Sequence, residues 1–253
     1  EGRVDIVVGT HALLSDQVVF SDLGLLVIDE EQRFGVKQKE KLRVLREHVD
    51  TLSMSATPIP RTLHLSMTGV RDISLINTPP RNRLPVDTKV MEFDERVLAD
   101  AVDEELRRGG QVFVVYDRVR DIQEWADRVQ SWAPQARVAV AHGQMHEKDL
   151  ETVMAAFMAG DADILVATSI IENGLDVPNA NTMIILNAHR FGMSQLYQMR
   201  GRVGRSHIHA YAYLVVPKGL VLPLDAQKRL EALQRCTDLG SGYQLAMKDL
   251  EIR

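Results

Sequence analysis

The sequence predicts an α/β protein with parallel sheets and flanking helices, and two observations indicate this class. Short, continuous apolar runs recur along the chain, and segments with helical periodicity lie between them. A region rich in proline and arginine, residues 78–85, interrupts this alternation, which then restarts. Because its three prolines remove backbone donors and stiffen the chain, we expect this region to link two parts of the molecule.

The first part is expected to contain three strands, each of which runs into small or polar residues. Leu25–Ile28 is a run of four aliphatic residues without alternation, which predicts a strand covered on both faces. Asp29 and Glu30 follow it directly, at the edge where α/β sheets bind ligands. The segment Lys37–His48 predicts a charged, solvated helix. The other two strands are predicted at Ile6–Val8 and Thr51–Met54.

The second part restarts with a helix over Asp94–Arg108, which has acidic residues in its first turn, arginines in its last and Gly109 just beyond. Five strands with helical segments between them then predict a doubly wound parallel sheet. The amphipathic segment Asp225–Cys236 and the break at residues 240–242 predict the first arm and the turn of a helical hairpin. The five strands are Val112–Tyr116, Val138–Ala141, Ile164–Ala167, Met183–Leu186 and Tyr211–Val216.

The composition excludes several classes of protein. The 253 residues suffice for one large or two ordinary domains, and the apolar (45%) and charged (26%) shares are typical of soluble globular proteins. No run of about 18 apolar residues and no signal peptide are visible, so we expect no membrane partner. The single Cys236 suits a reducing compartment such as a bacterial cytoplasm. Because the net charge is −5, any contact with nucleic acid is expected to be local.

Arginines on a glycine-punctuated turn form the first candidate site. The segment Gln198–Arg205 places Arg202 and Arg205 three positions apart, and the chain carries no acidic residue between Asp176 and Asp225. Arginines without a neighbouring carboxylate are available for an outside anion, and a guanidinium suits phosphate. Taken alone, an arginine pair favours a basic surface loop over a phosphate site.

The acidic pair after the first long apolar run forms the second candidate site. One carboxylate of Asp29 and Glu30 can hold the water shell of Mg²⁺, and its neighbour can take a proton from an attacking water. An acidic cap on the following helix is the alternative. Together with a distant arginine-rich turn, the pair is typical of the two halves of a nucleoside triphosphatase site.

Five segments resemble, in order, the successive motifs of superfamily 2 helicases. Within that superfamily the whole chain is similar to the bacterial transcription-repair coupling factor family, and RecG branch-migration helicases are the next relatives. The order Glu31-Gln32 and the ending from Asp238 to Arg253 favour the coupling factors over RecG. The five segments are Thr10–Leu14, Asp29–Val36, Ser55–Thr62, Thr168–Asp176 and Gln198–Arg205.

The resemblance implies RecA-like lobes. It divides the chain into the C-terminal half of a first lobe (residues 1–79), a complete second lobe (80–217) and the start of a translocation motif (218–253). It also implies ATP and Mg²⁺, with Asp29 holding the metal through water and Glu30 acting as the base. On the second lobe Gln198 helps to position the attacking water, and Arg202 and Arg205 act on the γ-phosphate. The residues that border the nucleotide are Gly174 and Asp176.

The resemblance further implies an interaction with double-stranded DNA. The segment Ser55-Ala56-Thr57 couples hydrolysis to the grip on DNA, and Arg253 resembles the arginine of the translocation-motif loop. Hydroxyls and backbone N–H groups bind phosphates without reading sequence. The residues expected near the DNA backbone are Thr10, His11, Arg118, His142, Gly143 and Thr168.

Several of these residues have plainer interpretations. His142 is equally compatible with a strand-end histidine and Arg118 with a solvated charge at a helix start. Thr57 with its following proline is compatible with a simple turn, and Arg253 with a charge at a helix C-terminus. For the helix Lys37–His48 the less favoured alternative is a role in gripping DNA.

One motif of the family is absent. The loop G-x-x-x-x-G-K-[ST] cradles phosphates, and no glycine in this sequence is followed by lysine. We therefore expect a fragment of an ATP-driven DNA translocase that displaces stalled RNA polymerase and couples transcription to repair, inactive as an ATPase by itself. RNA polymerase and excision-repair proteins are expected to bind other segments of the parent. The alternatives are a RecG-type helicase and a DNA clamp that does not hydrolyse ATP.

Overall fold

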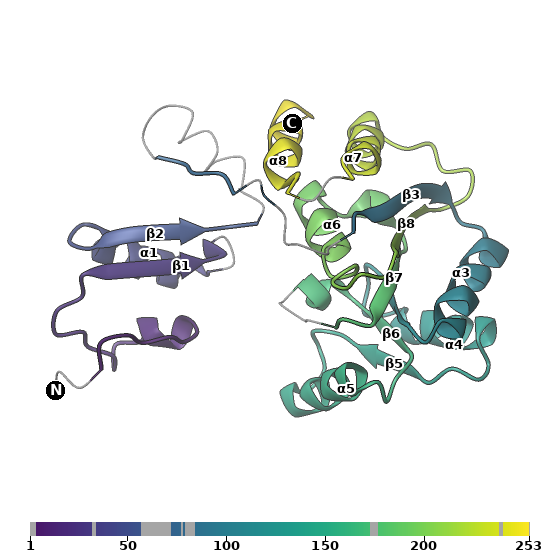
Figure 1. The fold of residues 1–253 in the computed structure, drawn as a ribbon, viewed down its shortest axis with the longest axis horizontal. Coiled ribbons are helices and arrows are strands. Elements are labelled where there is room, and N and C mark those ends of the chain that lie inside the picture. Colours follow the sequence, from purple (N-terminus) through teal and green to yellow (C-terminus); the bar gives the residue numbers. More distant parts are fainter. Residues whose placement is uncertain are drawn as a thin grey trace. The chain divides into compact units, whose positions relative to one another are not determined.

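In a computed structural model the protein divides into two compact units, Glu1–Ile59 and Pro60–Arg253 (Figure 1). The structure describes residues 4–31, 34–56, 72–76, 78, 84–172, 177–237 and 240–252. Among the residues with an expected function, Thr57, Gly174, Asp176 and Arg253 lie outside these ranges. No helix in the described ranges is both long enough and apolar enough to cross a lipid bilayer.

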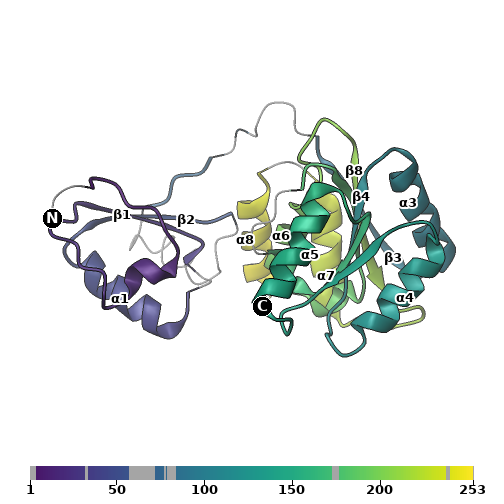
Figure 2. The ribbon, with the colours of Figure 1, turned by 90° about the horizontal axis from the view of Figure 1, so that it is seen from below.

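Two parallel strands form the sheet of the first unit. β1 (Leu25–Asp29) pairs with β2 (Asp50–Met54), and its last residue lies opposite Met54. The helix α1 (Val36–Arg46) runs along one face of this pair, as both ribbon views show (Figure 2), and a short 3₁₀ helix, η1 (His11–Leu14), precedes the strands. In the described part of this unit only Ile28 and Leu42 are buried apolar residues.

Two expectations for this unit are wrong. The segment Ile6–Val8 pairs with no strand in the described part of the chain, and Ile6 and Val8 are 81% and 93% exposed. The strand β1 is covered on one face only, because Leu25 and Val27 are more than half exposed while Ile28 is buried. Alternate residues of a strand face opposite sides, so an apolar run reports the strand but not how many of its faces are covered.

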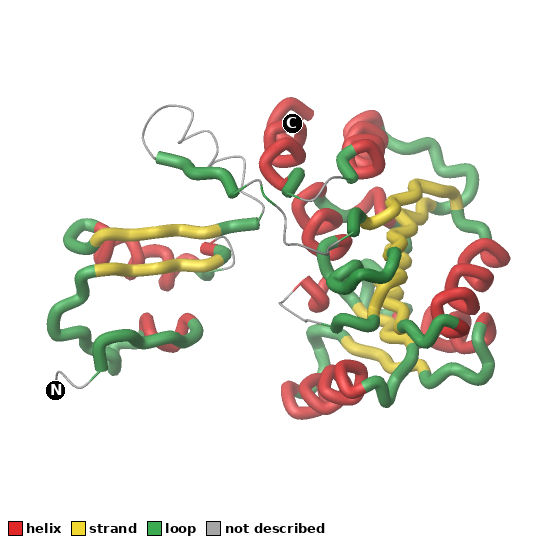
Figure 3. The backbone as a smooth tube through the Cα atoms, viewed as in Figure 1, coloured by secondary structure: helices red, strands yellow, loops and turns green. Residues whose placement is uncertain are grey.

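The second unit contains a six-stranded parallel sheet, which confirms the α/β class (Figure 3). The order of its strands is β3-β8-β7-β4-β6-β5, so that β4 lies in the middle between β7 and β6. All the pairings are parallel. The strands are β3 (Val86–Glu92), β4 (Gln111–Val115), β5 (Val138–Ala141), β6 (Ile164–Ala167), β7 (Ala180–Ile185) and β8 (Ala210–Val216).

Helices cover both faces of this sheet, as expected for a doubly wound fold (Figures 1 and 2). On one face α3 (Glu95–Arg107) and α4 (Ile122–Trp132) enclose a core with the β4 residue Val114. On the other face Phe113 of β4 packs in a second core with the remaining helices. These helices are α5 (Glu147–Ala159), α6 (Met193–Arg200), α7 (Leu224–Arg235) and α8 (Gly242–Ile252). The 3₁₀ helices η3 (Ser169–Glu172) and η4 (Ala188–Arg190) lie in the connections.

The strand β3 corrects the prediction of five strands. It pairs with β8 along its whole length, directly after the proline-rich region. Val86 and Thr88 are buried, whereas Asp87 and Lys89 are exposed. Buried and exposed residues therefore alternate along β3 with a period of two, and the charged residues at its exposed positions interrupt the apolar run.

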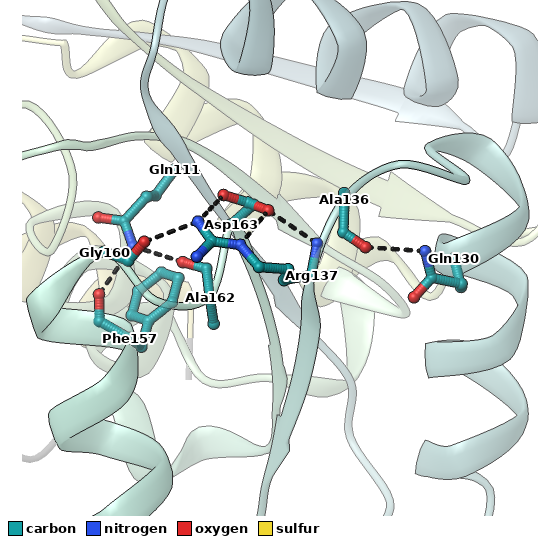
Figure 4. A network of polar contacts seen from close by, with 8 residues as sticks. All are labelled: Gln111, Gln130, Ala136, Arg137, Phe157, Gly160, Ala162 and Asp163. Atoms are coloured by element: carbon teal, nitrogen blue, oxygen red, sulfur yellow. Dashed lines mark hydrogen bonds and ion pairs between the residues drawn. The ribbon is translucent and has the colours of Figure 1, made fainter.

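A polar network fixes the starts of three neighbouring strands (Figure 4). The buried amide of Gln111 in β4 donates to the carbonyls of Phe157 and Ala162, each at 2.7 Å. The Arg137 guanidinium, beside β5, binds both carboxylate oxygens of Asp163, beside β6, at 2.7 and 3.0 Å. These hydrogen bonds from Arg137 lower the pKa of Asp163 against the effect of burial. Because the N-terminal ends of the strands are held, their C-terminal ends present a fixed edge on the opposite side.

Candidate functional site

In the first unit the acidic pair lies at the C-terminal end of β1. Glu30 adopts a left-handed backbone conformation with φ of 48°, and its N–H donates to the carbonyl of Met54 at 3.0 Å. Its carboxylate accepts from the N–H of Ala56 at 3.2 Å and from the hydroxyl of Ser55 at 3.4 Å. A left-handed glutamate costs roughly 1–3 kcal/mol, which surrounding contacts must offset. The structure thus joins the expected catalytic base to the expected coupling segment.

The position of Asp29 fits a hydrated magnesium ion. It is exposed at the carboxyl end of a parallel strand, beside Glu30. Within the described part of the chain, no group of three or more His, Cys, Asp or Glu side chains could form an all-protein metal cage. Mg²⁺ characteristically keeps several waters and binds through one or two carboxylates, so the accessible carboxylate of Asp29 suits it.

A third acidic residue at this turn, Glu31, received no role at the site from the sequence. Glu31 forms a two-pronged ion pair with Arg46 of α1, at 3.0 and 2.7 Å. Ser53 of β2 joins them, accepting from Arg46 at 3.0 Å and donating to Glu31 at 3.4 Å. Arg46 is 15 positions downstream of Glu31, a separation that no helical or strand periodicity connects.

Thr10 and His11 lie at the start of η1, and both are exposed. The hydroxyl of Thr10 accepts from the N–H of Ala12 at 3.4 Å and so caps this short helix. Their expected contact with DNA stays a prediction.

In the second unit the expected DNA-contacting residues follow three adjacent strands. Arg118 comes after β4, Thr168 after β6, and His142 with Gly143 after β5. Thr168 is buried, and its N–H donates to the carbonyl of Ala141 at 3.2 Å. Since parallel strands end at the same edge, the structure brings these four residues to the C-terminal edge of the sheet.

The ring of His142 is engaged locally, since its Nδ1 accepts from the N–H of Gln144 at 3.3 Å. Gly143 lies where an added Cβ would meet only the Ile170 side chain, at an ordinary 3.5 Å. The backbone there does not require glycine for steric reasons.

Arg190 also lies in the stretch of sequence without acidic residues, but the structure gives it a carboxylate partner. Its guanidinium binds Asp117, just after β4, at 2.6 Å, and Asn187 donates to the same carboxylate at 2.7 Å. Arg118 approaches it at 3.5 Å. Burial raises the pKa of Asp117, but the hydrogen bonds from Asn187 and Arg190 outweigh it and lower the pKa overall. The partner comes from 73 positions upstream, where a scan of the local sequence does not find it.

The arginine turn begins at the end of α6, the helix that carries Gln198. Arg205 donates from its Nε to the carbonyl of Gly201 at 3.4 Å. Gly204 has a φ of 69°, and a Cβ there would lie 3.1 Å from Ala210 and from Val86. The turn is therefore packed against the starts of β8 and β3, and glycine is needed at this position.

A further arginine anchors this helix and does not face an outside anion. Arg200 is only 5% exposed, and its guanidinium donates to the carbonyls of Leu233 and Cys236 at 2.9 and 2.7 Å. It also lies over the ring of Tyr197. These contacts tie α6 to the end of α7. Of the closely spaced arginines in this segment, Arg200 therefore has a structural role, which the sequence pattern alone does not distinguish.

Comparison with known proteins gives the family. Residues 1–65 match the model of DEAD/DEAH box helicases, and residues 95–207 match the helicase conserved C-terminal domain. The chain is 56% identical over 252 residues to the transcription-repair-coupling factors of Bacillus subtilis (strain 168) and Staphylococcus aureus (strain USA300). The chain belongs to the transcription-repair-coupling factor family. All of it is covered, but it spans only 21% and 22% of these relatives.

Solved structures agree with the RecA-like fold class. RecG bound to a three-way DNA junction is 39% identical, with a TM-score of 0.76, and covers 100% of this chain, which spans 33% of that protein. Saccharomyces cerevisiae Dbp5 bound to RNA and ADP BeF3 is 15% identical, with a TM-score of 0.58, over 90% of this chain and 63% of that one. The second likeness concerns the fold alone.

Proposed function

We propose that the parent of this chain is an ATP-dependent double-stranded DNA translocase that displaces stalled RNA polymerase and couples transcription to DNA repair. Family membership supports the class of motor. The single observation that supports hydrolysis is the contact of the Glu30 carboxylate with the Ser55–Ala56 segment. RNA polymerase and excision-repair proteins bind segments of the parent outside these residues. The lone Cys236 suits a cytoplasmic location.

In this proposal the acidic pair and the arginine turn each have a role in ATP hydrolysis. Asp29 holds Mg²⁺ through its water shell, and Glu30 accepts the proton of the attacking water. Gln198 helps to orient that water, and Arg202 and Arg205 stabilise negative charge on the γ-phosphate. Mg²⁺, when bound, neutralises charge on the phosphate oxygens. The residues proposed to border the nucleotide are Gly174 and Asp176.

The DNA contacts are proposed at the C-terminal edge of the second sheet and in the first unit. Ser55, Ala56 and Thr57 transmit the state of the nucleotide to them, because Glu30 already bonds to two of these residues. Arg253 serves the same coupling at the end of the chain. Phosphate contacts without base readout suit a motor that must move along any sequence. The proposed contact residues are Thr10, His11, Arg118, His142, Gly143 and Thr168.

Two other functions make different demands. A clamp that only binds DNA needs no general base, so the held carboxylate of Glu30 argues against it. A RecG-type enzyme uses the same motor on branched DNA, and the RecG structure contains a three-way junction. The distinction therefore lies in the substrate that the parent acts on.

The test uses the whole parent protein on two DNA substrates. On duplex DNA carrying a stalled RNA polymerase, we expect ATP-dependent release of the polymerase and its transcript, measured by native gel electrophoresis. On a model replication fork, we expect little or no rewinding of the arms. Rewinding of the fork without release of the polymerase would favour the RecG-type function, and binding without ATP hydrolysis would favour the clamp.

Residues 1–253 alone are predicted not to hydrolyse ATP. The chain lacks the glycine-lysine loop that supplies the backbone cradle and the lysine for the β- and γ-phosphates. A phosphate-release assay on purified residues 1–253, with and without duplex DNA, measures this directly. Turnover that rises when DNA is added would contradict the prediction.

A further inference from the structure

The ion pair between Glu31 and Arg46 differs from the other ion pairs of α1 in geometry and burial. Both terminal guanidinium nitrogens of Arg46 reach the carboxylate, and the two side chains are only 19% and 26% exposed. By contrast, Arg43 and Glu40 on the same helix form a pair that is 70% and 63% exposed. Two-pronged, partly shielded pairs are the strong ones, whereas exposed pairs contribute little.

This pair lies directly beside the proposed base. Glu31 follows Glu30 in the chain, so a displacement of its carboxylate moves the backbone that sets the direction of the Glu30 side chain. The Ser53 hydroxyl ties the pair to β2, two positions before Ser55. The turn after β1 is thus bonded to β2 by Glu31 through Ser53 and by the Glu30 N–H through Met54. The Glu30 carboxylate bonds to the Ser55–Ala56 segment directly after β2.

The left-handed conformation of Glu30 gives the contacts of the Glu31 side chain a purpose. A glutamate with φ of 48° relaxes toward ordinary backbone angles unless the residues on either side are held. On its N-terminal side the strand β1 holds it, and its own N–H bonds to Met54. On its C-terminal side, Arg46 holds the Glu31 side chain to α1.

We infer that Arg46 is a positioning residue for ATP hydrolysis, which acts through Glu31 to keep the Glu30 carboxylate in place beside Ser55 and Ala56. The inference rests on the proposed function, because it assigns a role in the reaction proposed for Glu30. A displacement of a reacting group by about 1 Å can lower a rate by roughly 10²-fold. The pair therefore contributes to turnover without needing to touch the nucleotide.

The experiment measures ATP turnover of the whole parent protein with saturating duplex DNA, well below the melting temperature of each variant. The variants are Glu31→Gln, Arg46→Gln and the double variant. The exposed pair supplies matched controls, Glu40→Gln and Arg43→Gln, on the same helix. We expect each variant of the buried pair to lower kcat by about 10- to 100-fold, with the KM for ATP changed less than about twofold. The controls are expected to stay within about twofold of the unmutated protein.

Two further measurements separate positioning from loss of folding. If Glu31 and Arg46 act as one unit, the kcat of the double variant is no lower than the lower kcat of the two single variants. Arg46→Lys keeps the charge but loses the two-pronged geometry of the guanidinium. We expect a fall in kcat of about 3- to 10-fold with little change in melting temperature. If Arg46→Gln fails to fold, the kcat of Arg46→Lys is compared with that of its control, Arg43→Lys.

The outcomes also separate this inference from the proposed function. If the unmutated parent hydrolyses ATP and Glu30→Gln does not, the proposed chemistry stands whatever happens at Arg46. A kcat for the Arg46 variants within twofold of the controls then overturns the positioning role. A fall in kcat/KM that arises wholly from a raised KM overturns it as well. A parent without ATPase activity overturns both.

Discussion

In the unit Glu1–Ile59 the acidic turn is held mainly by polar contacts, whereas in the unit Pro60–Arg253 the arginine turn is held by a packed core. The described part of the first unit buries two apolar side chains, Ile28 and Leu42, while the second has cores on both faces of its sheet. Glu30 depends on hydrogen bonds to Ser55 and Ala56. Conservative polar substitutions are therefore expected to affect the first unit, and changes of volume the second.

The largest effect is expected for Glu30→Gln in the whole parent protein. The amide keeps the shape of the side chain but cannot accept the proton of the attacking water. We expect ATP to bind while turnover falls by about 10³-fold or more, near the upper range for general-base catalysis. Equilibrium binding of a fluorescent ATP analogue and a phosphate-release assay measure the two properties separately. Glu40→Gln, on the exposed face of α1, is the matched control, and a normal rate for Glu30→Gln would remove Glu30 from the mechanism.

Arg205→Ala tests the packed unit in the same assay. A guanidinium that stabilises charge on the γ-phosphate contributes at least about 10³-fold to kcat. Because the turn is fixed by Gly204 and the start of β8, we expect this loss without a large change in melting temperature. The exposed Arg235 at the end of α7 provides the control substitution Arg235→Ala. Turnover within about tenfold of the unmutated parent would show that Arg205 does not act on the phosphate.

The same contrast explains what the sequence could predict. The second sheet was largely predictable, because runs such as Ile164–Ala167 are continuous and every residue in them is buried. The strand β3 escaped because only alternate residues, such as Val86 and Thr88, are buried. In the first unit the apolar run of β1 suggested two covered faces, although Leu25 and Val27 are exposed.

The motif residues of the candidate site were predictable from local segments, but their partners were not. The bond from Ala56 to Glu30 spans 26 positions, the pair of Arg46 with Glu31 spans 15, and that of Arg190 with Asp117 spans 73. Such pairs follow from the packing of elements against each other, which periodicity along the chain does not encode. Arg200 makes the same point, since its role as an internal anchor depends on the position of α7.

A glycine substitution tests how tightly the arginine turn is packed in the unit Pro60–Arg253. We expect Gly204→Ala to lower the free energy of unfolding by roughly 2–4 kcal/mol, because the new Cβ adds close contacts at 3.1 Å to a left-handed backbone. Gly219→Ala is the matched control, with a φ of 70° but open space around it, and is expected to cost only about 1–2 kcal/mol. Urea unfolding of residues 1–253 measures both. Equal losses for the two variants would show that the contacts around Gly204 do not resist an added Cβ.

The smallest expected effect concerns an exposed polar cluster of the packed unit. Glu95 accepts from Arg128 at 2.8 and 3.1 Å and from the indole of Trp132 at 2.9 Å. Hydrogen bonds from Arg128 first, and then from Trp132, lower the pKa of Glu95 from its ordinary 4.5 to about 2. A carboxylate with a depressed pKa in the folded state stabilises that state above its unfolded pKa, and the contribution is lost as the pH falls from about 4.5 toward 2.

Glu95→Gln is therefore expected to lower the melting temperature at pH 7, and the difference from the unmutated protein is expected to shrink as the pH falls through this range. Since Glu95 and Arg128 are 47% and 42% exposed, solvent screening keeps the effect below about 1 kcal/mol. Glu124→Gln, at an exposed carboxylate on α4, is the control. Thermal melts between pH 7 and pH 3 measure the difference, and a gap that stays constant with pH would show that the charge of Glu95 does not support the fold.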